Sequence, residues 1–350
     1  MAGHFGHHEQ TDESIDHAEP TPQRTATPVR ISILSLPQRS TRRLGTHVRL
    51  QVGTPISEVP PSLHLRPKPQ YYISTTFHAE LILIDTKPDI LLISSDHVLF
   101  YAHSVFLLSS SDNELNGLLG GDAARTGSGV TARSICVGVP VDSTLFNVVL
   151  HTIYGMSCRQ FKPSLETLLQ AVKTLKTYGI AIDQVVEHNT PFYDHIVAES
   201  SQRPVEVFLV AAENSLETLA VTTSAHLRSF LLSQITDEMV ERMGPRYFNR
   251  LLKLHGDRMN YLKRLLLDAP KPHEEAVGCG VVEQRVLAQA WALARAFLVW
   301  KIKPDLPASV LQSTFGSLEE GLPCDACKKA LDVRVRQIVL DWSTKAKRTI

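Results

Sequence analysis

The chain has few cysteines, few aromatic residues and no excess of either charge. Its 350 residues include five cysteines, and aromatic residues make up 7%. So few thiols, scattered over this length, cannot form the disulfide framework of a small secreted domain. The 36 basic and 36 acidic residues balance, so the whole chain lacks the positive charge that nucleic-acid binding requires. We therefore expect neither a disulfide scaffold nor direct contact with nucleic acid.

A secretory signal and a membrane-spanning run are also missing from the sequence. The opening residues Met1–His8 are polar and lack the basic and apolar parts of a signal peptide. The most apolar window, Ala290–Trp300, is shorter than a membrane span and contains Arg295. We predict that this window is a buried helix, and that the protein is cytoplasmic or nuclear and makes no membrane contact.

Three segments differ in composition and pattern. Residues 1–65 hold seven prolines among serine, threonine, arginine and glutamine, with no sustained helical period, which predicts a largely disordered tail. Residues 66–187 mix strand-like and helix-like stretches. Residues 188–350 read as serial helices without a fixed-period repeat. The expected organisation is a tail, a mixed α/β-containing domain and a helical region.

A β-hairpin is predicted near the start of the mixed domain. Two apolar, β-rich stretches, Ile90–Ile93 and Val98–Tyr101, flank the polar residues Ser94–His97, which have turn chemistry. An earlier stretch, Phe77–Asp85, is apolar on both faces of an extended chain and predicts a strand buried on both sides. Such burial would follow from exchange of this strand across a dimer.

Two amphipathic helices follow the hairpin. The first is expected over Asp142–Tyr154, capped by Asp142 or Ser143 and stopped by Gly155. The second is expected to start near Pro163 and to stop at Gly179, with a buried stripe of leucine and valine residues. Both helices need a partner surface for their apolar faces.

In this order and spacing, the residues resemble the BTB/POZ family. The family pattern is a strand aspartate, a hairpin, an aromatic, a small residue and a histidine, then an apolar residue, a serine and a later helix ending in Ile-Tyr. The matching residues here are Asp89, Phe100, Ala102, His103, Leu107, Ser111, Ile153 and Tyr154. The arrangement of such a domain before an uncharacterised helical region resembles long BTB proteins of fungi.

The resemblance implies an α+β fold, the BTB/POZ fold, in which a small β-sheet is flanked by helices. It also implies a homodimer that self-associates through its N-terminal strand and first helix. Family members are adaptors for cullin-type ubiquitin ligases or parts of transcription regulators. Many members pair the strand aspartate with a basic residue directly after the histidine to hold a partner peptide. Ser104 stands there in this chain, so we do not expect that charged pocket.

Helix signals continue to the end of the chain. Pro204 and Ser215 are expected to begin helices, the second of which would carry Leu216, Leu219, Thr223, Leu227 and Phe230. Thr236 caps the next, Gly244 stops it and Pro245 starts a longer one. After a break at residues 270–280, a helix is predicted through Val286, Ala290, Trp291, Ala294 and Phe297, and a last one over residues 323–345. We expect these helices to recruit other proteins.

Cys324 and Cys327 allow two interpretations. Their Cys-x-x-Cys spacing suits thiolate ligands of zinc, with Cys279, His255 or His273 as candidates to complete the site. The same two positions also continue the helical stripe of Leu331, Val335, Ile338 and Trp342, and small buried cysteines pack as apolar residues. Structural packing and metal binding both remain open at this point.

No arrangement of residues points to catalysis. His103 has Asp96 and several serines nearby in sequence, but its apolar neighbourhood predicts a core histidine. No nucleophile stands beside a recognisable base. We therefore predict a non-enzymatic interaction protein without a cofactor, and keep as the alternative a zinc-binding protein that uses Cys324 and Cys327 structurally or catalytically.

Overall fold

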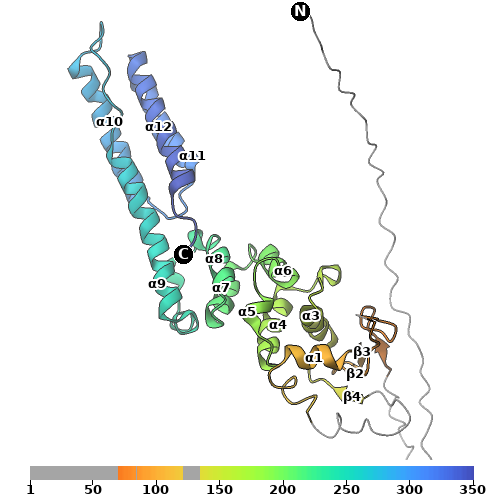
Figure 1. Ribbon diagram of the computed structural model, residues 1–350. Helices are drawn as coiled ribbons and strands as arrows, with labels where there is room; N and C mark the ends of the chain where they lie inside the picture. Colours follow the sequence, from red (N-terminus) through yellow and green to blue (C-terminus); the bar gives the residue numbers. More distant parts are fainter. Residues whose placement is uncertain (1–69, 84, 121–134) are drawn as a thin grey trace, which may run out of the picture.

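The computed structural model describes residues 70–83, 85–120 and 135–350. Over these residues the chain is α+β and mostly helical, with a four-stranded sheet and eleven α-helices. The sheet lies at one end of an elongated body, and α10 and α12 lie at the other (Figure 1). The tail predicted to be disordered, residues 1–65, lies outside the described residues. None of the described helices is long and apolar enough to cross a membrane.

The predicted hairpin is confirmed and forms the centre of the sheet. Leu92 pairs with Phe100 in the antiparallel register, and the serine side chain of Ser94 accepts a hydrogen bond from the Val98 N–H at 3.0 Å across the turn. Two parallel strands extend the hairpin on either side, in the order β1-β3-β2-β4. The strands are β1 (Tyr72–Ile73), β2 (Ile90–Ile93), β3 (Val98–Ala102) and β4 (Ile135–Gly138).

The strand predicted over Phe77–Asp85 is wrong. No described residue of that stretch belongs to a strand. Leu83 makes an isolated bridge to Thr86, and the Phe77 carbonyl accepts one hydrogen bond from the Tyr101 N–H of β3 at 2.9 Å. Asp85 has a left-handed backbone with φ +58°, so the chain turns back on itself there instead of extending. Ile82 is 56% exposed. The place beside β3 is taken by β1, so apolar composition alone misled the prediction.

Three helices complete the layer beside the sheet: α1 (Ser104–Ser110), α3 (Ser143–Ile153) and α4 (Leu165–Thr177). Asp142 caps α3 as predicted, because its carboxylate accepts a hydrogen bond from the Leu145 N–H at 2.9 Å. Gly179 ends the turn after α4 with φ +69°. A side chain there would collide with Asn113, whose atoms would lie within 3 Å of an added Cβ, so glycine is required.

Four shorter helices follow: α5 (Ile182–Val185), α6 (Pro191–Glu199), α7 (Pro204–Glu213) and α8 (Glu217–Ser224). Pro204 begins α7 as predicted. The helix predicted from Ser215 through Phe230 is partly right: α8 carries Leu219 and Thr223, but it starts at Glu217 and ends at Ser224. Ser215 has φ +56° and belongs to the turn that closes α7, where the Leu216 N–H reaches the Ala211 carbonyl at 2.8 Å.

The remaining helices are longer: α9 (Asp237–Leu267), α10 (Val281–Trp300), α11 (Ala308–Gly316) and α12 (Asp325–Lys345). Thr236 caps α9, as expected, by accepting from the Met239 N–H at 3.2 Å. Gly244 is non-helical, with φ 65° and ψ 166°, so the predicted stop and restart at Gly244 and Pro245 form a kink within α9. Short 3₁₀ turns lie at Arg159–Phe161, Leu227–Ser229, Leu232–Gln234 and Glu319–Gly321.

The buried side chains form two clusters that meet along α9. The proximal core runs from Phe77 to Leu254 and includes Ile350, and the distal core runs from Leu262 to Ala346. We call residues 70–258 the proximal region, within its described part, and residues 259–346 the distal region. The proximal core continues without interruption across residue 187, where the sequence suggested a domain boundary; that boundary remains a prediction.

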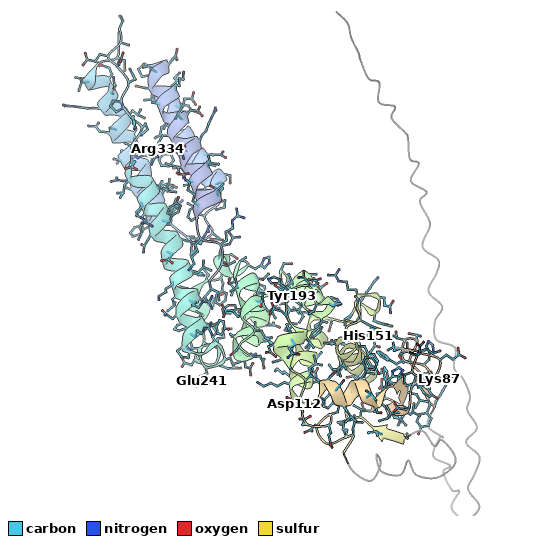
Figure 2. The ribbon with its side chains drawn as sticks, viewed as in Figure 1. Lys87, Asp112, His151, Tyr193, Glu241 and Arg334 are labelled. Atoms are coloured by element: carbon cyan, nitrogen blue, oxygen red, sulfur yellow. The ribbon has the colours of Figure 1, made fainter. Side chains whose placement is uncertain are left out.

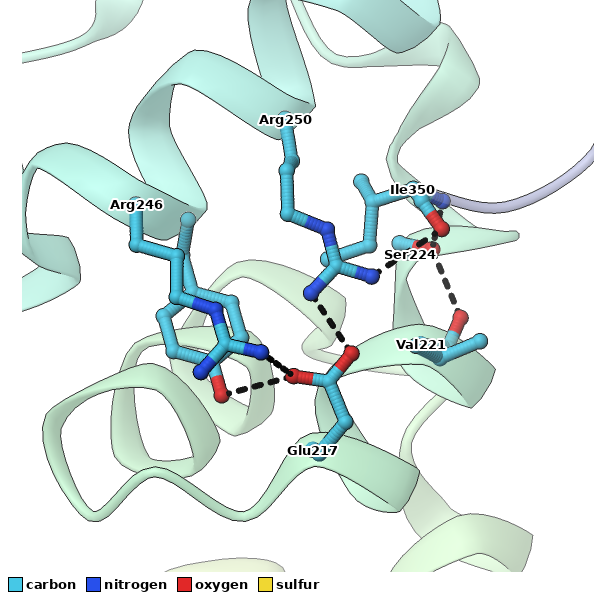
Figure 3. A network of polar contacts seen from close by, with 7 residues as sticks. Glu217, Val221, Ser224, Arg246, Arg250 and Ile350 are labelled. Atoms are coloured by element: carbon cyan, nitrogen blue, oxygen red, sulfur yellow. Dashed lines mark hydrogen bonds and ion pairs between the residues drawn. The ribbon is translucent and has the colours of Figure 1, made fainter.

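The last residue of the chain returns to the proximal core (Figure 3). The Ile350 N–H donates to the Ser224 hydroxyl at 3.0 Å, and Arg250 donates to the Ile350 carbonyl at 3.3 Å. Arg250 also pairs with Glu217 at 2.6 Å, and Glu217 pairs with Arg246 at 3.0 Å. These contacts connect α8, α9 and the end of the chain.

The face of α10 that is buried differs from the one predicted. Leu287, Trp291 and Leu298 are buried, and Trp291 stacks on Phe315 of α11 with ring centroids 4.0 Å apart. Val286 and Phe297 were expected in the core but are 53% and 49% exposed. The helix is apolar on almost every side, so periodicity could not decide which face packs, and the prediction that residues 290–300 are buried is only partly right.

A candidate metal centre

Four side chains with metal-binding atoms converge in the distal region. They are His273 and Cys279, from the loop between α9 and α10, and Cys324 and Cys327, from the start of α12. Their ligand atoms, one nitrogen and three sulfurs, all lie within 4.8 Å of one another. All three cysteines are free thiols. Among the described residues, this is the group of histidine, cysteine and acidic side chains that could hold a metal ion.

Four of the six distances among the ligand atoms lie near the edges of a tetrahedron around zinc. With Zn–S near 2.3 Å and Zn–N near 2.05 Å, ideal edges are about 3.8 Å between sulfurs and about 3.6 Å between sulfur and nitrogen. Cys279 Sγ and Cys327 Sγ lie 3.6 Å apart. His273 Nε2 lies 3.2 Å from Cys327 Sγ, and 3.4 Å from the sulfurs of Cys279 and Cys324. A zinc ion therefore fits among these four atoms with small shifts.

The loop between α9 and α10 is built to present its two ligands. Ala276 and Cys279 exchange backbone hydrogen bonds of 3.2 and 2.9 Å across a tight turn, in which Gly278 has φ +81°. That left-handed conformation favours glycine. The turn leaves Val277 fully exposed at its tip and buries Cys279. The cysteine is thus fixed by backbone geometry before any ligand binds.

His273 is oriented by contacts outside the ligand set. Its Nδ1 lies 2.6 Å from the Glu274 carbonyl, so Nδ1 carries the proton and donates it, which leaves Nε2 as the atom facing the sulfurs. Gln284 of α10 donates to the His273 carbonyl at 3.1 Å. Metal-bound histidines in proteins are held in this way by a second hydrogen bond.

α12 and α9 hold the rest of the site. Cys324 is the N-cap residue of α12, and Cys327 lies in its first turn. Arg334, labelled in Figure 2, donates from α12 to the Leu265 and Asp268 carbonyls at 2.7 and 3.0 Å. These bonds secure the end of α9, where the loop carrying His273 begins, against the helix that carries the cysteine pair.

The three thiols differ in acidity. Burial raises the pKa of Cys279 to about 12 and also raises the pKa of Cys327. The backbone N–H of Cys327 lowers the pKa of Cys324 to about 7. Two of the three thiols therefore keep their protons at neutral pH without a cation, and a bound cation would have to displace them.

The two interpretations of the Cys-x-x-Cys pair do not exclude each other. Cys327 is buried and lies on one stripe with Leu331, Val335, Ile338 and Trp342, as the packing interpretation predicts. Cys324 is half-buried at the start of the helix and packs against the distal core. Of the three candidates to complete the site, Cys279 and His273 both join it. The His-x5-Cys spacing of His273 and Cys279, in the break before α10, was the sequence signal that pointed to these two ligands.

His255 does not belong to the cluster. It is buried in α9, where its Nε2 lies 3.0 Å from the Leu227 carbonyl. Catalysis by a His103–Asp96 pair finds no geometric support either, because Asp96 accepts from the N–H and hydroxyl of Ser143 at 2.8 and 2.6 Å. His103 instead lies 3.0 Å from the Thr86 carbonyl and 3.2 Å from the Tyr154 hydroxyl.

The residues that carry the family resemblance make structural contacts around α1. Asp89 accepts from the Ser104 N–H at 2.7 Å and from its hydroxyl, at the first turn of α1. The Tyr154 hydroxyl accepts from the His103 N–H at 2.8 Å, and burial raises the pKa of Tyr154 to about 12. The Asp89 carboxylate is therefore bonded to Ser104, which stands at the position of the basic residue that pairs with it in many family members.

The other two signature residues fix the far end of α1. Leu107 is fully buried. The Ser111 hydroxyl donates to the Tyr178 carbonyl at 2.6 Å and accepts from the Leu115 N–H at 2.8 Å. The five residues therefore lie around one helix, and none of them joins the metal cluster.

In comparisons with known proteins, no family model, no curated protein and no solved structure matches the chain.

Proposed function

We propose that this chain is a non-enzymatic protein whose distal region binds one structural zinc ion through His273, Cys279, Cys324 and Cys327. The observation that carries the proposal is the convergence of one nitrogen and three sulfurs within 4.8 Å. Three thiolates and one imidazole are a typical ligand set of structural zinc sites. Softer thiolate ligands also select zinc over magnesium or calcium.

A structural role is favoured over a catalytic one because the four protein ligands complete the tetrahedron. Catalytic zinc sites keep one position for water or substrate, and no such position remains here. The ligands also come from separate elements, the loop before α10 and the start of α12. A zinc ion would hold those elements together, and its binding free energy would contribute to folding.

Metal analysis of the full-length protein, purified under reducing conditions, tests this. We expect about one zinc per chain in the wild type and a loss of zinc in Cys324→Ser/Cys327→Ser. The matched control is Cys136→Ser/Cys158→Ser, which removes two thiols from the proximal region and should leave zinc unchanged. Cobalt substitution should give the intense visible bands of tetrahedral thiolate coordination, weakened by Cys279→Ser. A wild-type protein without bound zinc, or a double variant that retains it, would refute the site.

We also propose that the protein is a self-associating adaptor of the kind implied by the resemblance to BTB domains. A specific observation favours this: α1 exposes Val105 and Leu108, which are 70% and 44% exposed and lie on neighbouring positions of one helical face. Exposed apolar neighbours of this kind mark interaction surfaces more often than isolated residues do. The occupant proposed is α1 of a second copy, with cullin-type ligase scaffolds or transcription regulators as further partners.

Light scattering on the full-length protein at tens of micromolar tests self-association. The proximal core extends to Leu254, so a fragment ending near residue 187 would cut through it. We expect a dimer in the wild type and a monomer in Val105→Glu/Leu108→Glu. The matched control, Leu293→Glu on α10, changes an exposed leucine elsewhere and should leave the dimer intact. A wild-type monomer at these concentrations would contradict the proposal.

A further inference from the structure

A polar cavity of about 580 Å³ lies where the proximal and distal regions meet. Its walls come from the 3₁₀ turn after α8, the middle of α9, the loop before α11 and the end of the chain. The side chains that matter are Arg228, Arg258, Asp305, Trp342 and Arg348. This volume falls within the range of small-ligand sites in proteins, about 300–1,000 Å³.

Three arginines line this cavity without a carboxylate partner. Arg228 donates to the Ala225 carbonyl at 2.7 Å and Arg348 to the Ser343 carbonyl at 2.8 Å. Arg258 donates to the carbonyls of Pro304 and Lys347. These acceptors are neutral, and none of the three guanidinium groups takes part in an ion pair with the described carboxylates. No ion pair therefore neutralises these three positive charges, although the more distant Asp305 carboxylate attracts Arg258 electrostatically.

Arg258 makes this arrangement costly in the absence of an anion. It is 4% exposed, and a buried charge normally has a charged partner. Burial, together with the neighbouring charge of Arg228, lowers the pKa of Arg258 to about 10. Its guanidinium also lies 4.4 Å from the centroid of the Trp342 ring, which offsets part of the cost. Asp305 lines the cavity too, but it is exposed and forms no ion pair with the arginines.

We propose that this arginine pocket, defined by Arg228, Arg258 and Arg348, binds a small anion bearing two or more phosphate groups. Guanidinium groups are planar forks of N–H donors that match phosphate oxygens in pairs. All three have donors to spare: these bonds use only Nε of Arg228 and only Nη2 of Arg348, and Arg258 uses Nε and Nη1 but not Nη2. A single phosphate would fill a small part of the cavity, whereas a diphosphate can reach more than one arginine.

The bound anion would join the two regions. Arg228 belongs to the proximal region, Arg348 follows α12, and Arg258 lies on α9 between the two cores. An anion held by all three bridges these elements and binds only the folded arrangement. Ligand binding would therefore raise the stability of the junction in proportion to the logarithm of ligand concentration. The inference is independent of the zinc site, which lies at the opposite end of α12.

Calorimetric titration of the full-length protein, as purified, with pyrophosphate tests the pocket. We expect saturable binding, weakened at least tenfold by Arg228→Ala and by Arg348→Ala, because each removes charge-assisted hydrogen bonds. The matched control is Arg336→Ala on α12, whose arginine is largely exposed and paired with Asp332; it changes net charge equally and should alter affinity less than twofold. Asp305→Asn should tighten binding severalfold, because it removes the negative charge in the cavity.

Two further titrations identify the class of ligand. Inorganic phosphate should bind more weakly than pyrophosphate if the pocket contacts two phosphate groups. Tighter binding of ADP than of pyrophosphate would indicate a phosphate ester whose ring contacts Trp342, and quenching of tryptophan fluorescence would accompany it. The proposal is overturned if pyrophosphate shows no saturable binding at millimolar concentration, or if Arg336→Ala weakens binding as much as the pocket variants.

Discussion

The proximal and distal regions differ in the size and composition of their cores. The proximal core lies between the sheet and eight helices and contains a large set of buried apolar side chains, including Phe77, Phe100 and Phe208. The distal core has far fewer members, and two of them are cysteines. A small core offsets less of the conformational entropy lost on folding, so small units commonly add a metal or a disulfide. We therefore expect the distal region to depend on the proposed zinc ion and the proximal region not to depend on it.

The two regions also differ in what they leave exposed. α10 of the distal region exposes Leu293 and Trp300 by 74% and 89%, although it is among the most apolar helices of the chain. In the proximal region the comparable helix α7 is buried along most of its length. With fewer neighbouring elements, the distal helices cannot cover all of their apolar surface.

The largest expected effect is the loss of the metal. Chelation, or Cys279→Ser, should unfold or loosen the distal region by several kcal/mol, because structural zinc contributes free energy of folding directly. Hydrogen exchange should accelerate across α10 to α12 and stay slow in α3 and α4. Cys158→Ser, a buried thiol of the proximal region, is the control for thiol loss. Equal acceleration in both regions would show that they unfold as one unit.

Cavity-forming substitutions sharpen the same comparison. Leu168→Ala in α4 and Leu262→Ala in α9 each remove a fully buried side chain, and each should cost about 2–5 kcal/mol. The first should speed hydrogen exchange in the proximal region, and the second in the distal region, most strongly in zinc-free protein. Identical exchange patterns for the two variants would contradict the division into two cores.

A pair of glycines should respond in opposite directions. Gly179→Ala places a Cβ within 3 Å of Asn113 at a positive φ, so we expect about 1–3 kcal/mol of destabilisation. Gly256→Ala lies inside α9, where an added Cβ meets nothing within 4 Å, and should stabilise by about 0.5–1 kcal/mol. Urea denaturation followed by circular dichroism measures both. Destabilisation by Gly256→Ala would show that the middle of α9 is more closely packed than described.

The smallest effect is the response of the proximal region to pH. Burial lowers the pKa of His151 below its ordinary 6.5, so the unfolded chain takes up a proton that the folded chain resists. Stability should be complete above about pH 6.5 and fall as the pH drops below that value, by at most about 1.4 kcal/mol per pH unit. Urea midpoints of the wild type and His151→Gln should converge at low pH. The distal region should instead lose stability when acid protonates the zinc ligands, so a chelator should change its pH profile and leave the proximal profile unchanged.

Local signals predicted much of the fold. The turn residues Ser94–His97, the cap Asp142 and the Gly244–Pro245 pair all act through their immediate neighbours, and the structure bears them out. Errors arose where tertiary contacts decide. Phe77–Asp85 looked like a strand because of its composition, and α10 is too uniformly apolar for its packed face to be read from sequence.

The candidate metal site was half visible in the sequence. The spacing of Cys324 and Cys327 identified one pair, but His273 and Cys279 lie about 50 residues earlier, so only folding brings them close. The arginine pocket gave no signal at all. Arg228, Arg258 and Arg348 are separated by 30 and 90 residues in a chain of zero formal charge, and no local pattern links them.

The bonds of Arg258 to Pro304 and Lys347 have a consequence for how the chain could change over evolution. Arg258 lies where the chain enters the distal region, and its bond to the Lys347 carbonyl reaches the point where the chain leaves that region. Its bond to the Pro304 carbonyl holds the loop between α10 and α11 at the same place, and Ile350 then rejoins the proximal core. The distal helices therefore form an insertion whose two ends lie next to each other. Such an insertion can be lengthened, exchanged or removed by joining the chain between its ends, and the rest of the molecule would keep its connectivity.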